Sequence, residues 1–137
     1  MDHPPKLKRS RVDFILVSVR GEGEELTKRI TGIATLAEEH GASAEVAGGI
    51  VLATYGALAD EEKGGEQPRR LIEALKRSLP SDIKILYGWE VGHSGFLVGR
   101  EQLAYNIILP HMTKARHRVH ELNWGEVVEF DPRETKA

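Results

Sequence analysis

The sequence predicts an α+β domain in which helices lie on one face of a mostly antiparallel sheet. Three observations lead to this prediction. Six short segments rich in β-branched and aromatic residues are apolar in alternation or continuously, as strands are. Three longer segments carry apolar residues at helical spacing. Their order along the 137 residues is β-α-β-β-α-β-β-α-β without an internal repeat, which is enough chain for one domain with its own core.

The first half of the chain supplies three strands and one helix. Residues 12–19 are apolar on both faces, so we expect a central strand that is covered on both sides. Residues 24–40 have the spacing of an amphipathic helix. Strands over 42–47 and 50–55 are predicted to meet at the two-residue turn Gly48-Gly49.

The second half is predicted to hold two helices and a glycine-rich hairpin. A helix over residues 68–79 is followed by an alternating strand over 83–91. The glycines of residues 92–95 then predict a turn into a short strand over 96–99. The last helix is expected over 110–122, because a proline suits its first turn.

The two ends of the chain differ from the middle. A final strand is predicted over residues 126–130, so the folded domain is expected to span 12–131. Residues 1–11 contain two prolines and four basic side chains and are expected to be a flexible basic arm. Residues 132–137 are expected to be a flexible tail.

Composition limits the classes of function. With 40% hydrophobic and 29% charged residues the chain is typical of a soluble globular protein, and cytoplasmic localisation is expected. A net charge of −2 gives no general attraction to nucleic acid or to acidic membranes, and no apolar run is long enough to span a membrane. Without cysteine there is no disulfide, thiolate metal site or cysteine nucleophile.

Short glycine and apolar marks fall between the predicted elements in a definite order. They are Val19-Arg20-Gly21, Gly48-Gly49, Tyr55-Gly56, the spaced Gly92, Gly95 and Gly99, and Tyr105-Asn106-Ile107-Ile108. In order and separation these marks resemble the catalytic domain of class III adenylate and guanylate cyclases, over roughly residues 13–130. The resemblance implies a ferredoxin-like (cyclase-like) sandwich.

The catalytic residues that the resemblance implies are missing. In the cyclases two aspartates hold two metal ions, which activate the ribose hydroxyl and neutralise the triphosphate. The matching positions here are Ser18 and Gly49, and neither can replace a carboxylate for a hard divalent cation. Thr113 and His117 stand where the family has a helical Asn and Arg, with Arg116 one residue away. We therefore expect no catalytic residue, no bound metal and no cofactor.

The last helix carries the candidate ligand site. We expect Arg116 first, then Lys114 and His111, to contact a small anionic ligand, with His93 and Glu90 nearby on the hairpin. The alternative is a solvated basic helix face. Glu90 and His93 are also the pair that an enzyme acting on a phosphorylated or acidic substrate would use for acid/base chemistry. Glu90 alternates with the apolar residues of its strand, which favours a surface position.

A histidine-based metal site is a further possibility on this helix. His117 and His120 stand at i, i+3 spacing, and Glu121 follows. His117 lies almost opposite the apolar stripe, however, so ordinary surface residues are favoured.

Three functions follow from these observations. The leading hypothesis is a catalytically inactive cyclase-like domain that acts as a homodimeric regulatory or small-anion-binding module. A homodimer is expected because the strand at 12–19 is apolar on both sides while helices are predicted on one side only. Tyr87 and Trp89 are expected to pack in the core or in that dimer contact. The alternatives are an enzyme of unknown reaction and a protein-interaction module of ferredoxin-like architecture.

Overall fold

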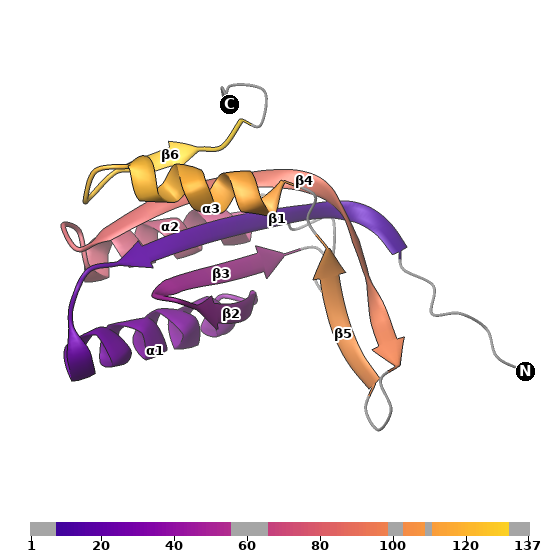
Figure 1. The fold of residues 1–137 in the computed structure, drawn as a ribbon, viewed down its shortest axis with the longest axis horizontal. Coiled ribbons are helices and arrows are strands. Elements are labelled where there is room, and N and C mark those ends of the chain that lie inside the picture. The colour runs from indigo at the N-terminus through magenta and orange to yellow at the C-terminus, as the bar shows by residue number, and fades with distance from the viewer. Residues whose placement is uncertain (1–7, 56–65, 99–102, 109–110, 132–137) are drawn as a thin grey trace, which may run out of the picture.

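The computed structural model describes residues 8–55, 66–98, 103–108 and 111–131, and within them the side chains of 11–55, 66–91 and 111–131 (Figure 1). The elements are β1 (Lys8–Val19), α1 (Gly23–Glu39), β2 (Ser43–Ala47), β3 (Ile50–Tyr55), α2 (Glu66–Ser78), β4 (Ile83–Val98), β5 (Leu103–Ile108), α3 (Met112–Glu121) and β6 (Val127–Glu129). The α+β class and the order of strands and helices are as predicted. Within the described part of the chain, no helix is long and apolar enough to cross a membrane.

The sheet is built around β1. Its strand order is β2-β3-β1-β4-β5, and β6 also pairs with β4. Only the β4–β6 pair is parallel among the described pairs. Leu16 at the middle of β1 faces Leu52 on one side and Leu86 on the other. The central position predicted for the first strand is therefore correct.

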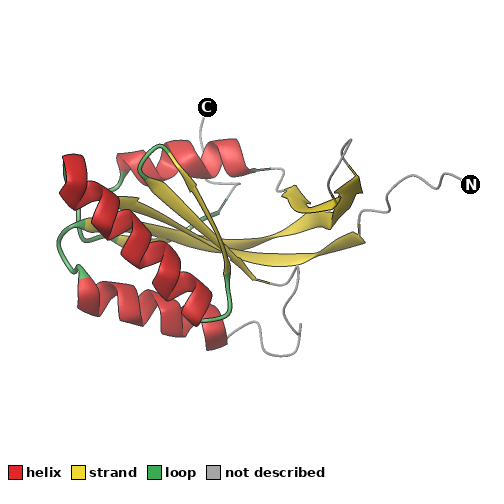
Figure 2. Ribbon diagram, turned by 90° about the horizontal axis from the view of Figure 1, so that it is seen from below, coloured by secondary structure: helices red, strands yellow, loops and turns green. Residues whose placement is uncertain are grey.

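Helices cover both faces of the sheet, which corrects the prediction of a single covered face. Ile15 and Val17 belong to a core under α1 and α2, whereas Phe14 and Leu16 belong to a second core under α3. Figure 2 shows α1 and α2 on one side of the sheet and α3 on the other. The physical reason is the continuous apolar sequence of β1, because a strand that is apolar on both sides needs cover on both sides.

The turn predicted at residues 92–95 does not exist. β4 runs without interruption from Ile83 to Val98, and the next strand is Leu103–Ile108 rather than 96–99. Gly92 and Gly95 stay extended because Gly92 pairs with Ser10 of β1 and Gly95 pairs with Asn106 of β5. Glycine permits a turn but does not impose one when partners on both sides continue the ladder.

β1 is also longer than predicted. It begins at Lys8, which pairs with Ser94, so residues 8–11 belong to the sheet and not to a flexible arm. The start of β1, the end of β4 and β5 together extend beyond the helices (Figures 1 and 2). We call this part of the sheet, Lys8–Arg11 with Val91–Val98 and Leu103–Ile108, the sheet extension.

Candidate functional site

The end of β1 and the β2–β3 turn lie side by side. Ser18 pairs with Ile50, and the backbone N–H of Val19 donates to the carbonyl oxygen of Gly49 at 3.4 Å. Gly48 and Gly49 form the predicted turn with φ of 55° and 80°, a left-handed backbone that favours glycine. The two positions that the resemblance equates with metal-binding aspartates are thus neighbours in space.

The immediate surroundings of Ser18 contain no carboxylate from the paired strands. Ser18 is buried, with 7% of its surface exposed. Its cross-strand neighbours are Ile50 of β3 and Lys84 of β4, and directly paired residues place their side chains on the same face of a sheet. The described residues also hold no group of three side chains able to bind a metal ion. This corner of the sheet therefore presents a cation where a metal site would need anions.

A tryptophan and two cations form a cluster at the same end of the sheet. The Lys84 ammonium lies 4.5 Å from the centre of the Trp124 ring, and the Arg20 guanidinium lies 5.1 Å from it. Lys84 also donates to the backbone carbonyl of His120 at 3.1 Å, which ties it to the end of α3. Arg20 is held by Asp82, with 3.1 Å between Nε and Oδ1. Sequence reasoning missed this cluster, because its members are far apart in the chain and follow no periodic pattern.

Glu90 is a buried residue, which corrects its predicted surface position. Only 6% of it is exposed, and its Oε1 accepts a hydrogen bond from the backbone N–H of His111 at 3.1 Å. The same oxygen lies 2.6 Å from Nδ1 of the His111 ring. The other carboxylate oxygen, Oε2, is buried and has no hydrogen-bond partner within the described part of the chain. Glu90 therefore joins β4 to the start of α3.

The structure thus gives Glu90 a different histidine partner from the one proposed. His93 was its expected partner, but only the backbone of His93 is described, paired with Arg9 and Ile108. His111 precedes α3 and is its N-cap residue. A carboxylate at this end stabilises a helix because it accepts a free N–H and faces the positive end of the dipole. A ligand anion at the same helix end would meet the negative charge of Glu90.

The remaining cations of α3 divide into paired and unpaired ones. Arg118 lies 3.7 Å from Glu121 on the same helix. Lys114 is exposed and Arg116 is half-buried, and neither has a hydrogen-bond or ion-pair partner among the described residues. His117 is exposed, as its position relative to the apolar stripe predicts. Lys114 and Arg116 are therefore the predicted ligand residues still available for an anion.

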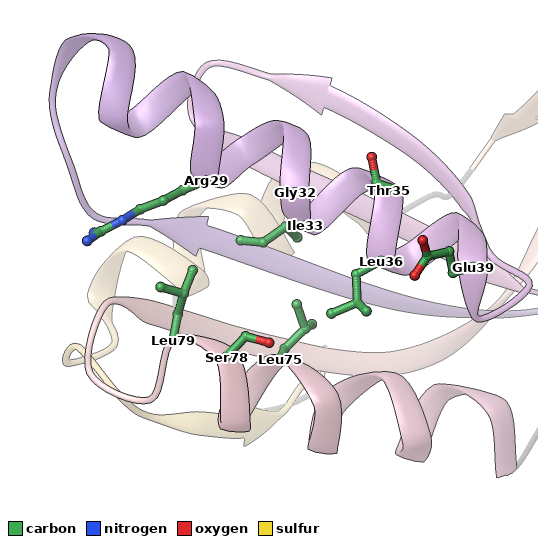
Figure 3. Close-up of a pocket in the computed structure, with 9 residues that line it drawn as sticks. All are labelled: Arg29, Gly32, Ile33, Thr35, Leu36, Glu39, Leu75, Ser78 and Leu79. Atoms are coloured by element: carbon green, nitrogen blue, oxygen red, sulfur yellow. The ribbon is translucent and has the colours of Figure 1, made fainter.

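Two grooves lie on the α1–α2 face, away from these residues. One, of about 460 Å³, runs between α1 and α2 over an apolar floor that includes Ile33 and Leu75 (Figure 3). The other, of about 390 Å³, lies between α2 and the sheet beside Trp89. Neither groove is lined by any of the predicted ligand residues.

Comparison with solved structures identifies the fold. The adenylyl cyclase CyaB from P. aeruginosa matches with a TM-score of 0.63 and 13% identity, covering 90% of this chain and 78% of that one. The non-canonical dimeric guanylyl cyclase domain of the RhoGC fusion protein from the aquatic fungus Blastocladiella emersonii matches with a TM-score of 0.68 and 12% identity, covering 88% of this chain and 80% of that one. The guanylate cyclase domain of RhGC from Catenaria anguillulae, in complex with GTP, matches with a TM-score of 0.66 and 12% identity, covering 86% and 77%.

Sequence comparison gives no match of its own. No protein-family model matches the chain. A search of curated proteins also gave no match. The chain therefore has the fold of adenylyl and guanylyl cyclase domains, and the resemblance seen in the sequence is confirmed at the level of the fold.

Proposed function

We propose that this chain, which has the fold of a nucleotide cyclase domain, is a catalytically inactive member of that architecture acting as a homodimeric regulatory module. The observation that carries the proposal is the pairing of Ser18 with Ile50 and Lys84. The turn beside it supplies Gly49, which has no side chain. The corner that would have to hold two divalent cations has one hydroxyl and one ammonium group instead.

Electrostatics oppose both halves of a metal–nucleotide complex at this corner. Two unit charges 4 Å apart interact by about 1 to 4 kcal/mol, depending on screening, and a divalent ion doubles the effect of a fixed cation such as Lys84. A triphosphate at the start of α1 would meet Glu22 and Glu24, whereas Glu25 is paired with Arg29 at 2.6 Å. These glutamates favour the helix through its dipole while they repel phosphate. The corner thus disfavours the metal ions, and the start of α1 disfavours the phosphates.

The test measures metal binding and turnover separately. We expect no cyclic nucleotide from ATP or GTP with Mg²⁺ or Mn²⁺, and no metal-dependent rise in Tm with either triphosphate. Titration of free Mn²⁺ by electron paramagnetic resonance gives the metal Kd directly. We expect weak binding for the wild type and for Ser18→Asp, and tighter binding for Ser18→Asp combined with Lys84→Gln. Metal-dependent stabilisation of the wild type by a triphosphate would refute the proposal.

The homodimer is a separate part of the proposal. It is supported by the fold, since one matching cyclase domain, that of RhoGC, was crystallised as a non-canonical dimer and also as a monomer. Sedimentation of the wild-type protein decides the matter. A stable monomer at high micromolar concentration would remove the dimer.

Binding of a small anion by α3 is a second candidate function. It is favoured by the absence of partners for Lys114 and Arg116 within the described residues. Phosphate or pyrophosphate should raise the Tm of the wild type, and Arg116→Ala should abolish the rise. Arg77→Ala, an exposed arginine on α2, serves as the control and should respond like the wild type. If neither anion shifts the Tm of the wild type, the small-anion function is abandoned.

A further inference from the structure

We propose that two copies of this chain pack through the sheet surface around Trp89 and Val91. This inference rests on the homodimer of the proposed function and names the surface that forms it. We call Trp89, Val91, Arg11 and Asp13 the Trp89 patch; they are neighbours on β4 and β1.

The Trp89 patch exposes more contiguous apolar surface than is usual for a protein that stays monomeric. Trp89 is 53% exposed and Val91 is 38% exposed, two of the four large exposed apolar side chains of the described residues. They alternate on β4 and therefore point to the same side of the sheet. Tyr87, two residues earlier on the same side, packs against the core under α1 and α2. The helices therefore cover Tyr87 more fully than they cover Trp89.

The charges of the patch suit a second copy of the same chain. Asp13 pairs across the strands with Trp89, and Arg11 pairs with Val91. Arg11 lies 3.1 Å from Asp13 and stacks over the Trp89 ring at 4.6 Å. A two-fold contact requires a surface that complements itself. One cation and one anion beside an aromatic ring meet this requirement, because a rotation about an axis near Trp89 sets each Arg11 against the partner's Asp13.

A nucleic acid or an anionic membrane fits the patch less well. Both partners demand a net positive surface. Arg11 is balanced by Asp13 within the patch, and the basic residues of the adjoining groove, Arg69 and Lys76, are accompanied by Glu73. The patch is therefore neutral with an apolar centre, which is typical of a protein contact.

The groove beside Trp89 could receive side chains of the second copy. Trp89 lines this groove of about 390 Å³ together with residues of α2 that include Ile72. Tryptophan beside a pocket is a frequent energetic centre of protein interfaces. A stable interface buries roughly 800 Å² on each partner. One tryptophan cannot supply that area, so the contact must also include residues of α2 that line the groove.

Sedimentation equilibrium of matched variants tests the patch. Trp89→Ala should raise the Kd of the dimer at least about 30-fold, because each dimer loses an interface tryptophan from both copies. Trp124→Ala is the matched control, since Trp124 is also exposed, at 38%, but lies with Arg20 and Lys84 at another part of the sheet. It should leave the dimer Kd unchanged. Val91→Glu, which places a charge in the patch, should act like Trp89→Ala.

Fluorescence gives an independent measurement that does not depend on removing Trp89. The chain has two tryptophans, so Trp124→Phe leaves Trp89 as the single reporter. Its quenching by iodide should increase as the protein is diluted through the dimer Kd. A wild type that stays monomeric at high micromolar concentration would overturn both this inference and the proposed dimer. A wild-type dimer unaffected by Trp89→Ala, with quenching independent of dilution, would overturn the Trp89 patch alone.

Discussion

Replacement of Glu90 tests whether the contact between β4 and α3 stabilises the protein. The Glu90 carboxylate accepts hydrogen bonds from the backbone and the ring of His111. Hydrogen bonds to a charged group contribute about 1.5 to 3 kcal/mol each, and a buried oxygen without a partner, here Oε2, costs about 1 to 3 kcal/mol. The two hydrogen bonds together contribute about 4.5 kcal/mol at the middle of this range, and the cost of the unpaired Oε2 is about 2 kcal/mol. We therefore expect Glu90→Ala to lower the free energy of unfolding by about 2.5 kcal/mol.

A second variant separates the hydrogen bond from the charge. Glu90→Gln keeps an oxygen that accepts from the His111 N–H, and it removes the burial of a charged group. We therefore expect Glu90→Gln to lower the free energy of unfolding by less than about 1 kcal/mol. Urea denaturation monitored by circular dichroism measures both changes, and thermal unfolding should show a fall in Tm of about 5 to 10 °C for Glu90→Ala.

Glu121→Ala is the control for the loss of a glutamate near α3. The Glu121 side chain is 68% exposed and lies 3.7 Å from Arg118, so its removal should cost less than about 0.5 kcal/mol. If Glu90→Ala is no more destabilising than this control, the contact does not hold α3 to the sheet. If Gln and Ala at position 90 are equally harmful, the hydrogen bond to the backbone is not the source of the stability.

Other substitutions test the core under α1 and α2 and one turn. Tyr55 donates from its hydroxyl to the carbonyl oxygen of His40 at 3.1 Å, so Tyr55→Phe should cost about 1 kcal/mol in urea denaturation. Burial raises the pKa of Tyr55 from 10.0 to about 12. Because the pKa of Tyr55 is higher in the folded state, the stability linked to its neutral hydroxyl is complete below pH 10 and is lost between pH 10 and about 12. The free energy of unfolding of the wild type should therefore fall more steeply in this range than that of Tyr55→Phe. Parallel pH profiles would contradict this reasoning. Gly125 has φ of 90°, and an added Cβ would lie 3.2 Å from the carbonyl oxygen of Pro80. Gly125→Ala should therefore lower the free energy of unfolding by about 1 to 2 kcal/mol. An unchanged urea midpoint would show that the turn relaxes freely.

The elements with strong periodic patterns could be predicted from the sequence. The continuous apolar run of β1 correctly predicts a strand at the centre of the sheet. The sheet extension could not be predicted, because Lys8–Arg11 are mostly charged or polar and carry no strand pattern. Their strand conformation comes from pairing with β4, more than 70 residues away in the chain. That pairing also keeps Gly92 extended, and pairing with β5 does the same for Gly95.

The candidate site was predicted less well, for a related reason. Alternation on β4 assigns Trp89 and Glu90 to opposite faces, but it does not say which face is covered at that point of the strand. The apolar side chain, Trp89, lies beyond the helix cover, and the charged one, Glu90, lies under the start of α3. Ser18 and Gly49, in contrast, lie side by side because the short hairpin predicted at Gly48-Gly49 fixes the register beside β1.

The length and position of β4 have a consequence for the order of folding. β4 pairs with β1, β5 and β6, and its first residue, Ile83, faces the last residue of β1, Val19. A growing chain on the ribosome therefore holds β1 with one open edge and apolar side chains on both faces until β4 has emerged. Such an edge invites pairing with other chains. When the full chain refolds, β4 is present from the start, so we expect pulse-labelling hydrogen exchange to show the amides of β1 and β4 becoming protected in one phase. Protection of β4 that lags behind that of β1 would contradict this reasoning. The strand that covers this edge of β1 is thus also one whose late synthesis leaves the nascent chain open to pairing with other chains.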